Sequence, residues 1–108
     1  MPESTAESYE RTKAELLKDP EVRASYHTAN IYRKLGSAIA NARQDQNMSV
    51  EELCRLSRVY NPVVFEVTNG GITMSGQLKD YVGMLDALGL EIVVEVRAKE
   101  ISENGDVS

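Results

Sequence analysis

Tryptophan is absent from this sequence, and cysteine, phenylalanine and histidine occur once each. The single cysteine, Cys54, cannot close a disulfide within the chain, and no apolar run is long enough for a signal peptide or a membrane span. His27 has no cysteine or second histidine with which to hold a metal ion. We therefore expect a protein of the reducing cytoplasm, without metal or other cofactor, in which Cys54 and His27 are ordinary structural residues.

Groups that would mark an enzyme are also missing. The sequence offers no nucleophile beside a base and no pair of carboxylates in an apolar setting. Gly70-Gly71 lacks the preceding strand and following helix of a phosphate-binding loop, so it predicts a turn. We expect no catalytic site.

Charge is unevenly distributed along the 108 residues. The net charge is -5, and the acidic surplus lies in residues 1–30 and 90–108, whereas the middle of the chain is balanced. An acidic surface as a whole repels nucleic acid, so any such contact requires a local basic face. The acidic flanks are typical of a solvated surface, and they would equally suit a basic protein partner.

One stretch, Ser49–Gly70, organises the expected fold. Ser49 followed by Glu52 has the spacing of a capping box, and Ser57–Asn61 is too short for anything but a tight turn between two helices. Helical spacing predicts that five apolar residues face inward: Leu53, Leu56, Val59, Val64 and Val67. Apolar content of 42% is ordinary for one small globular domain. Two short helices joined this way form a helix-turn-helix.

Helices are expected on both sides of this stretch. A first one ends near Lys18, and Asp19-Pro20 starts the next, which either stops near Asn30 or continues into a helix over residues 31–46. Asn47 is expected as a left-handed residue that ends this helix. A last helix, capped by Ser75 and ended by Gly89, would place Leu78, Val82, Leu85 and Leu88 on one face.

The period changes after Gly89. Ile92, Val94 and Val96 alternate with charged residues, which predicts a β-strand over residues 91–97. A single strand cannot pair its own backbone groups, and the sequence offers no second strand. We therefore expect Ile92, Val94 and Val96 to pair with the same strand of a second molecule in a homodimer, and residues 98–108 to form a loose tail.

Spaced residues from Leu35 to Val96 resemble a known family. They are Leu35-Gly36, Ile39, Arg43, Met48-Ser49, Glu51-Glu52-Leu53, Val59, Val64, Val67, Gly70 and Ala87-Leu88-Gly89. This pattern resembles the lambda-repressor-like, or xenobiotic-response-element, helix-turn-helix proteins. Residues 16–24 and 87–94 are similar to the HigA type of antitoxin within that family. The resemblance implies a dimeric DNA-binding protein that neutralises a RelE-like ribonuclease toxin and represses its own operon.

The resemblance also implies roles for individual residues. The second helix of the motif, about Asn61–Asn69, would enter the major groove of operator DNA. Asn61 suits an adenine edge, Val63 a thymine methyl and Glu66 a cytosine amine. The other expected DNA contacts are Arg43, Ser49, Arg58, Tyr60 and Asn69, mainly to phosphates. Here Tyr60 replaces the usual small cap, so Asn61-Pro62 is expected to cap and start the helix, with Arg58 in the left-handed turn position.

This interpretation divides the chain into four parts. Residues 1–30 form an N-terminal helical extension that would bind the toxin through Tyr9, Leu16, Leu17 and Tyr26. Residues 31–89 form the helix-turn-helix domain, 90–97 the dimerisation strand and 98–108 a disordered tail. Two alternatives remain open: a stand-alone or prophage-type repressor without a toxin, and a helix-turn-helix module that uses Val63 and Phe65 for protein contact and has lost DNA recognition.

Overall fold

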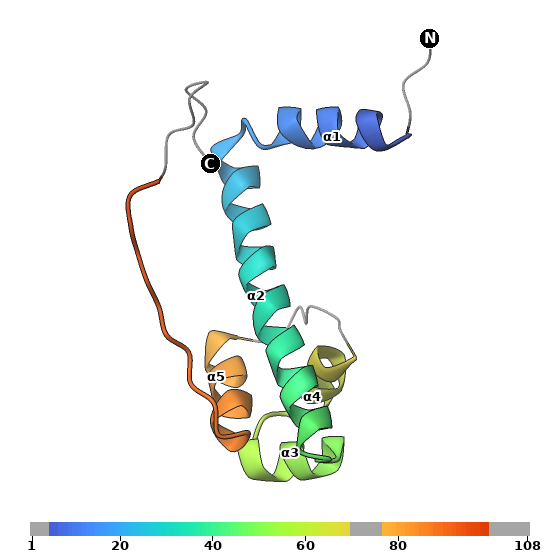
Figure 1. Ribbon diagram of the computed structural model, residues 1–108, viewed down its shortest axis with the longest axis vertical. Coiled ribbons are helices and arrows are strands. Elements are labelled where there is room, and N and C mark those ends of the chain that lie inside the picture. Colours follow the sequence, from blue (N-terminus) through green and yellow to red (C-terminus); the bar gives the residue numbers. More distant parts are fainter. Residues whose placement is uncertain (1–4, 70–76, 100–108) are drawn as a thin grey trace.

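The computed structural model describes residues 5–69 and 77–99, and within these ranges the protein is mainly α-helical (Figure 1). The helices are α1 (Thr5–Leu16), α2 (Pro20–Asp45), α3 (Val50–Ser57), α4 (Asn61–Thr68) and α5 (Leu78–Ala87). None of them, over the described ranges, combines the length and apolar character needed to cross a membrane.

Helix α2 is a single rod of 26 residues, which settles whether the chain breaks at Asn30. Its start is the predicted one: Asp19 Oδ1 accepts the backbone N–H of Glu21 at 2.8 Å, and Pro20 is the first helical residue. No glycine or proline occurs between Glu21 and Leu35, so nothing in the sequence interrupts the helix. The expected boundary between residues 30 and 31 therefore lies inside α2.

The core joins the second half of α2 to α3, α4 and α5, which we call the bundle. Helix α3 packs against α4 and α5, and α2 packs against the same two helices. Its buried apolar side chains are Ile39, Leu53, Cys54, Val59, Val63, Val64, Val67, Tyr81, Met84, Leu85 and Leu88. Figure 1 shows the first half of α2 extending out of this bundle, with α1 lying across its far end.

The connection from α3 to α4 confirms the tight turn. Ser49 Oγ accepts the backbone N–H of Glu52 at 3.0 Å and caps α3. Arg58 ends α3 with φ 57° and ψ 25°, the left-handed conformation expected of it. The expected cap at Asn61 is wrong, because Tyr60 is the N-cap residue and α4 already begins at Asn61, with no side chain bonded to its first amides.

Two other helix ends follow the sequence prediction. Asn47, just beyond α2, has φ 53°, and Gly89, after α5, has φ 77°. Both conformations suit residues that terminate a helix, glycine because it has no Cβ. The expected cap, Ser75, lies outside the described residues, and the N-cap residue of α5 is Gln77. Helix α5 begins only at Leu78, and Asp80 Oδ2 accepts the Gln77 backbone N–H at 2.9 Å.

The inward faces of two helices differ from the prediction. Leu56 is largely exposed, and Cys54 takes the buried position beside Leu53. In α5, Leu78 and Val82 lie at the edge of the bundle, whereas Tyr81 and Met84 fill its centre. Periodicity locates an apolar stripe only to within about one residue on each side, and packing decides which residues are innermost.

The expected strand over residues 91–97 is not present in the described structure. This segment is an extended chain without strand pairing that leaves the bundle after Gly89 (Figure 1). Ile92 packs partly against the core, but Val94 and Val96 are 78% and 92% exposed. A strand needs a hydrogen-bonding partner, and residues 5–69 and 77–99 supply none to this segment.

Candidate nucleic-acid interface

The exposed side of α4 is the surface on which the expected base contacts are concentrated. Asn61, Phe65 and Asn69 recur at every fourth residue, so they share one face, and Glu66 lies beside them. All four are exposed, Phe65 at 44%. This face combines two amides, a carboxylate and an aromatic ring, but α4 carries no basic residue. It offers amide and carboxylate groups that can form hydrogen bonds, and no positive charge that attracts phosphate.

Val63 is not part of this surface. Its side chain is 3% exposed and lies in the core, so the expected contact with a thymine methyl is wrong, as is its alternative use for protein contact. The reason is the helical period, because Val63 and Val67 are one turn apart and Val67 packs against Gly36 of α2. Phe65 is the apolar residue of α4 that remains accessible.

Arg43 and Ser49 meet at the start of α3. With Gln44, Asn47 and Met48 they line a shallow depression of about 440 Å³. The Arg43 guanidinium donates to the Met48 backbone oxygen at 3.0 Å, which holds the side chain against the α2–α3 connection, while its Nε is buried without a partner. Thr68, at the end of α4, donates its hydroxyl proton to the Val64 backbone oxygen at 2.8 Å.

Arg58 and Tyr60 lie at the other end of α3. Arg58 lines a second depression with Lys79, Asp80 and Asp86 of α5, so charges of both signs share this depression. Tyr60 is exposed in the turn. Ser49 and Arg58 flank α3 and are nine residues apart, which separates them by about 14 Å along the helix axis. Four of the expected phosphate contacts therefore form two pairs, one at each end of α3, and Asn69 lies apart from both at the end of α4.

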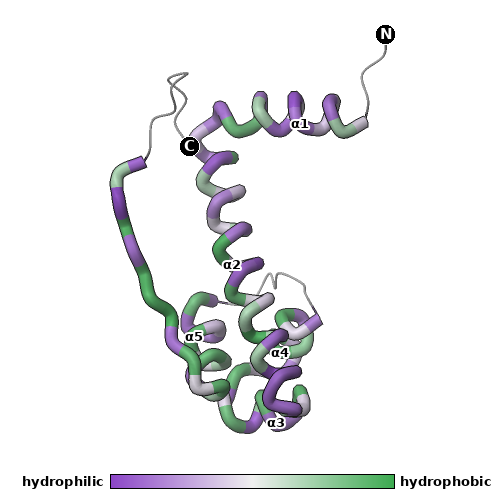
Figure 2. Tube along the Cα trace, in the orientation of Figure 1, coloured by the Kyte–Doolittle hydropathy of each residue, from purple (hydrophilic) through white to green (hydrophobic). Residues whose placement is uncertain are grey.

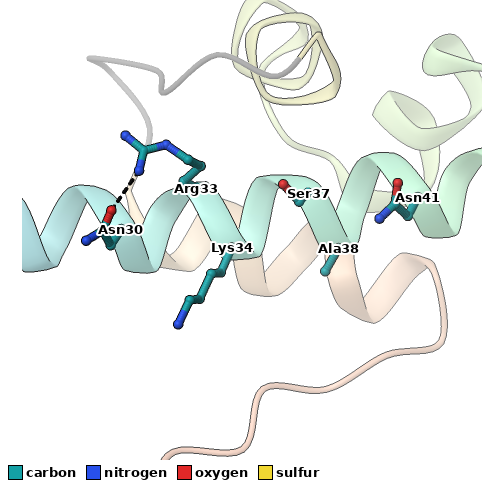
Figure 3. Close-up of a pocket in the computed structure, with 6 residues that line it drawn as sticks. All are labelled: Asn30, Arg33, Lys34, Ser37, Ala38 and Asn41. Carbon is teal, nitrogen blue, oxygen red and sulfur yellow. Dashed lines mark hydrogen bonds between the residues drawn. The ribbon is translucent and has the colours of Figure 1, made fainter. Parts of the chain in front are cut away.

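The sequence interpretation missed a polar surface on α2. Asn30, Arg33, Lys34, Ser37, Ala38 and Asn41 line a depression of about 540 Å³ along this helix. Arg33 donates to Asn30 Oδ1 at 2.6 Å, and Figure 3 shows Arg33 and Lys34 leaving α2 on opposite sides. A countable signal was available, because residues 22–44 contain four Lys or Arg and no Asp or Glu.

The expected toxin contacts gather where α1 meets α2. Tyr9 and Leu16 are exposed and share the face of α1 that carries Lys13, while Leu17 is half-buried. The Lys13 amine lies 5.0 Å from the ring centroid of Tyr26 on α2. This contact raises the pKa of Lys13 and lowers that of Tyr26, chiefly through the hydrogen bond between the two side chains. Lys13 thus links this face of α1 to Tyr26 near the junction of α1 and α2, which we call the elbow.

The remaining candidates for site chemistry are the Cys54 thiol and any cluster of metal-ligating side chains. Burial raises the pKa of the Cys54 thiol, which keeps it protonated and unreactive. Among residues 5–69 and 77–99, no three His, Cys, Asp or Glu side chains gather as ligands for a metal ion.

Comparison with protein-family models, curated proteins and solved structures finds no match to this chain.

Proposed function

We propose that this protein is a dimeric DNA-binding antitoxin that represses its own operon, with the exposed face of α4 as the base-reading surface. The observation that carries the proposal is the α3–α4 pair itself. A capped α3, a left-handed turn at Arg58 and a core-packed α4 hold Asn61, Glu66 and Asn69 on one exposed face. A rigid helix that presents amides and a carboxylate is the arrangement that reads base edges in the major groove.

The positions of positively charged residues support the same placement of α4 in the major groove. Arg43 with Ser49, and Arg58 with Tyr60, lie at the two ends of α3, next to the helix that would enter the groove. Contacts of this kind position a protein on the phosphate backbone without reading sequence. Helix α4 has no Lys or Arg, so DNA binding would depend on few phosphate contacts. Affinity for DNA would then be modest except at the matching operator.

The test of DNA binding is fluorescence anisotropy with DNA from the region upstream of the coding sequence, over a salt series and against scrambled DNA. Operator binding that weakens with salt is the expected result. Asn61→Ala should cost about 1–3 kcal/mol of operator binding, the usual worth of one base-reading side chain. Asn41→Ala, which removes the same exposed side chain from α2, is the matched control and should leave affinity unchanged. Equal binding to scrambled DNA would refute the proposal.

The elbow between α1 and α2 supports a protein partner for the same molecule. Helix α1 buries none of its residues and still presents Tyr9 and Leu16 to solvent. An exposed aromatic and a leucine on one helix face are typical of a surface that binds another protein. We assign this surface to a RelE-like ribonuclease toxin, whose basic RNA-binding cleft would suit the acids of the N-terminal flank.

Toxin binding is tested by co-purification with the product of a neighbouring reading frame and by inhibition of its ribonuclease activity. Leu16→Asp should abolish both, because it places a charge on the apolar face. Ala14→Asp adds the same charge on the other side of α1 and should not. If the Leu16→Asp variant still inhibits the toxin, the elbow is not the toxin-binding surface. If neither form of the protein binds a toxin, the protein is a repressor without this partner.

A second candidate function is a protein-interaction module that has lost DNA recognition. This function is favoured by the exposed Phe65 beside Glu66 on α4, a helix that has no Lys or Arg. Phe65→Ala distinguishes the two functions. It should leave operator binding within about threefold if α4 reads DNA through its amides, and should abolish the binding of a protein partner in the other case.

A further inference from the structure

An apolar groove runs between α2, α5 and the extended segment 90–95. Its floor and one wall are formed by Ile31 and Leu35 of α2 and by Leu78 and Val82 of α5, and the other wall by the segment itself. The groove encloses about 920 Å³. Figure 2 shows that apolar residues continue from the bundle into this segment as it runs alongside α2. Both the groove and the backbone of the segment are open to solvent.

We infer that this groove takes the same segment of a second copy of this chain, antiparallel to its own, in a register centred on Val94. The inference rests on the homodimer within the proposed function and specifies how that dimer is built. By two-fold symmetry the segment of each copy would occupy the groove of the other copy. Each groove is complete only when the other copy contributes residues to it.

Alternation of side chains fixes the parity of the register. Directly opposed residues in an antiparallel pair lie on the same face of the sheet, and residues two apart share a face. Ile92 already packs partly against the core, and Val94 and Val96 follow it on that face. A centre at Val94 sets Ile92 opposite Val96 and Val94 opposite itself. This centre matches the apolar set to itself, as a centre at Val93 also does, whereas a slip of one strand by one residue does not.

Charge narrows the choice of centre within this parity. With Val94 on the two-fold axis, Glu91 lies opposite Arg97, and the symmetry repeats this pair. A centre at Val93 would set Glu91 against Glu95, and a centre at Glu95 would set that residue against its own copy. Like charges directly opposite each other destabilise a strand pair. A centre at Val96 would also pair Glu95 with Arg97 but would set Ile92 opposite Glu100, so the apolar match and the charge match select Val94 only together.

The first experiment is disulfide trapping in the full-length protein without DNA or toxin. Val94→Cys and Val93→Cys are made in a Cys54→Ala background, since Cys54 is a small buried residue that alanine replaces with little change in volume. The two positions are a matched pair, 78% and 83% exposed. Under mild oxidation Val94→Cys should form covalent dimers at least about tenfold faster, because only a residue on the two-fold axis faces itself.

A charge exchange tests the register without cysteine chemistry. Arg97→Glu and Glu91→Arg should each raise the dimer dissociation constant by about two- to tenfold, the effect of exposed ion pairs, and the double variant should restore it. Sedimentation equilibrium measures all three. Faster trapping at Val93, an additive double variant or a monomer at every concentration would each overturn the inference. Operator binding plays no part in these measurements, so a dimer in this register that ignores operator DNA would refute the proposed function alone.

Discussion

The bundle contains every side chain that the described residues bury, whereas α1 and the segment 90–99 bury none. We call α1, the first half of α2 and segment 90–99 the arms. The arms are not poor in apolar residues, because Tyr9, Leu16, Ile31 and Val93 all lie there and are more than half exposed. The two regions differ in whether their apolar side chains find other side chains of the same chain to pack against. Bundle helices cover one another, and the arms present similar side chains to solvent, where other molecules bind.

The largest effect should separate the two regions by substituting the same residue type in each. Leu53→Ala removes a fully buried side chain and should lower the free energy of unfolding by about 2–5 kcal/mol. Leu16→Ala, on the exposed face of α1, should lower it by less than about 0.5 kcal/mol. Urea denaturation measures both. Equal losses would mean that α1 belongs to the same cooperative unit as the bundle.

Relief of backbone strain in the bundle should come next in size. Arg58 has φ 57°, a conformation that costs about 1–2 kcal/mol for a residue with a Cβ, so Arg58→Gly should stabilise the protein by about 1 kcal/mol. Arg55→Gly, three residues earlier in α3, should instead cost about 1 kcal/mol. If Arg58 contacts phosphate, Arg58→Gly also weakens operator binding while raising the melting temperature. A stable variant with full affinity would remove Arg58 from the interface.

Helix α2 belongs to both regions, which allows a comparison within one element. A Cβ added at Gly36 would lie 3.8 Å from Val67 Cγ1, an ordinary contact, so Gly36→Ala should stabilise the bundle by about 0.5–1 kcal/mol. Ala24→Gly, the reverse change in the exposed first half, should lower hydrogen-exchange protection around residues 20–30 and leave the urea midpoint unchanged. A shifted midpoint would show that the whole of α2 unfolds with the bundle.

The smallest effect should come from the contact that joins the two arm helices. Lys13→Ala removes the amine near Tyr26 and should leave the urea midpoint unchanged, since both groups are on the surface. The lowered pKa of Tyr26 should rise toward its ordinary value, because its chief cause is the Lys13 side chain. Spectrophotometric titration of the tyrosines detects this rise. An unchanged titration would place Lys13 away from the ring in solution.

Much of the helical architecture followed from the sequence. The sequence predicted the helix ends at Ser49, Asp19, Asn47 and Gly89, because caps and left-handed turns depend on residues within a few positions of one another. For the same reason the α3–α4 turn was located correctly. The left-handed turn at Arg58 was expected from the resemblance. The predicted N-caps of α4 and α5 were not found, because Tyr60 and Gln77, which are not among the usual capping residues, hold these positions.

The candidate site was less predictable than the fold. Helical spacing could not tell that Val63 faces the core and Phe65 the solvent, because four of the eight residues of α4 are buried and an apolar helix has no clear polar side. The polar surface of α2 was overlooked for another reason. The acid-free stretch from Val22 to Gln44 is plain in the sequence, but its exposure depends on which part of α2 the bundle covers.

The sequence by itself determined the caps at Asp19 and Ser49, the left-handed turn at Asn47 and the helix end at Gly89, and that residues 91–97 are extended with alternating apolar side chains. These properties arise from local sterics and hydrogen bonds between near neighbours. Only the tertiary structure decided that Cys54 and Tyr81 are inside while Leu56 is outside, and that the extended segment stays unpaired beside an open groove. Those outcomes depend on which surfaces meet across the chain, and packing between distant residues is not encoded in the period of any single helix or strand.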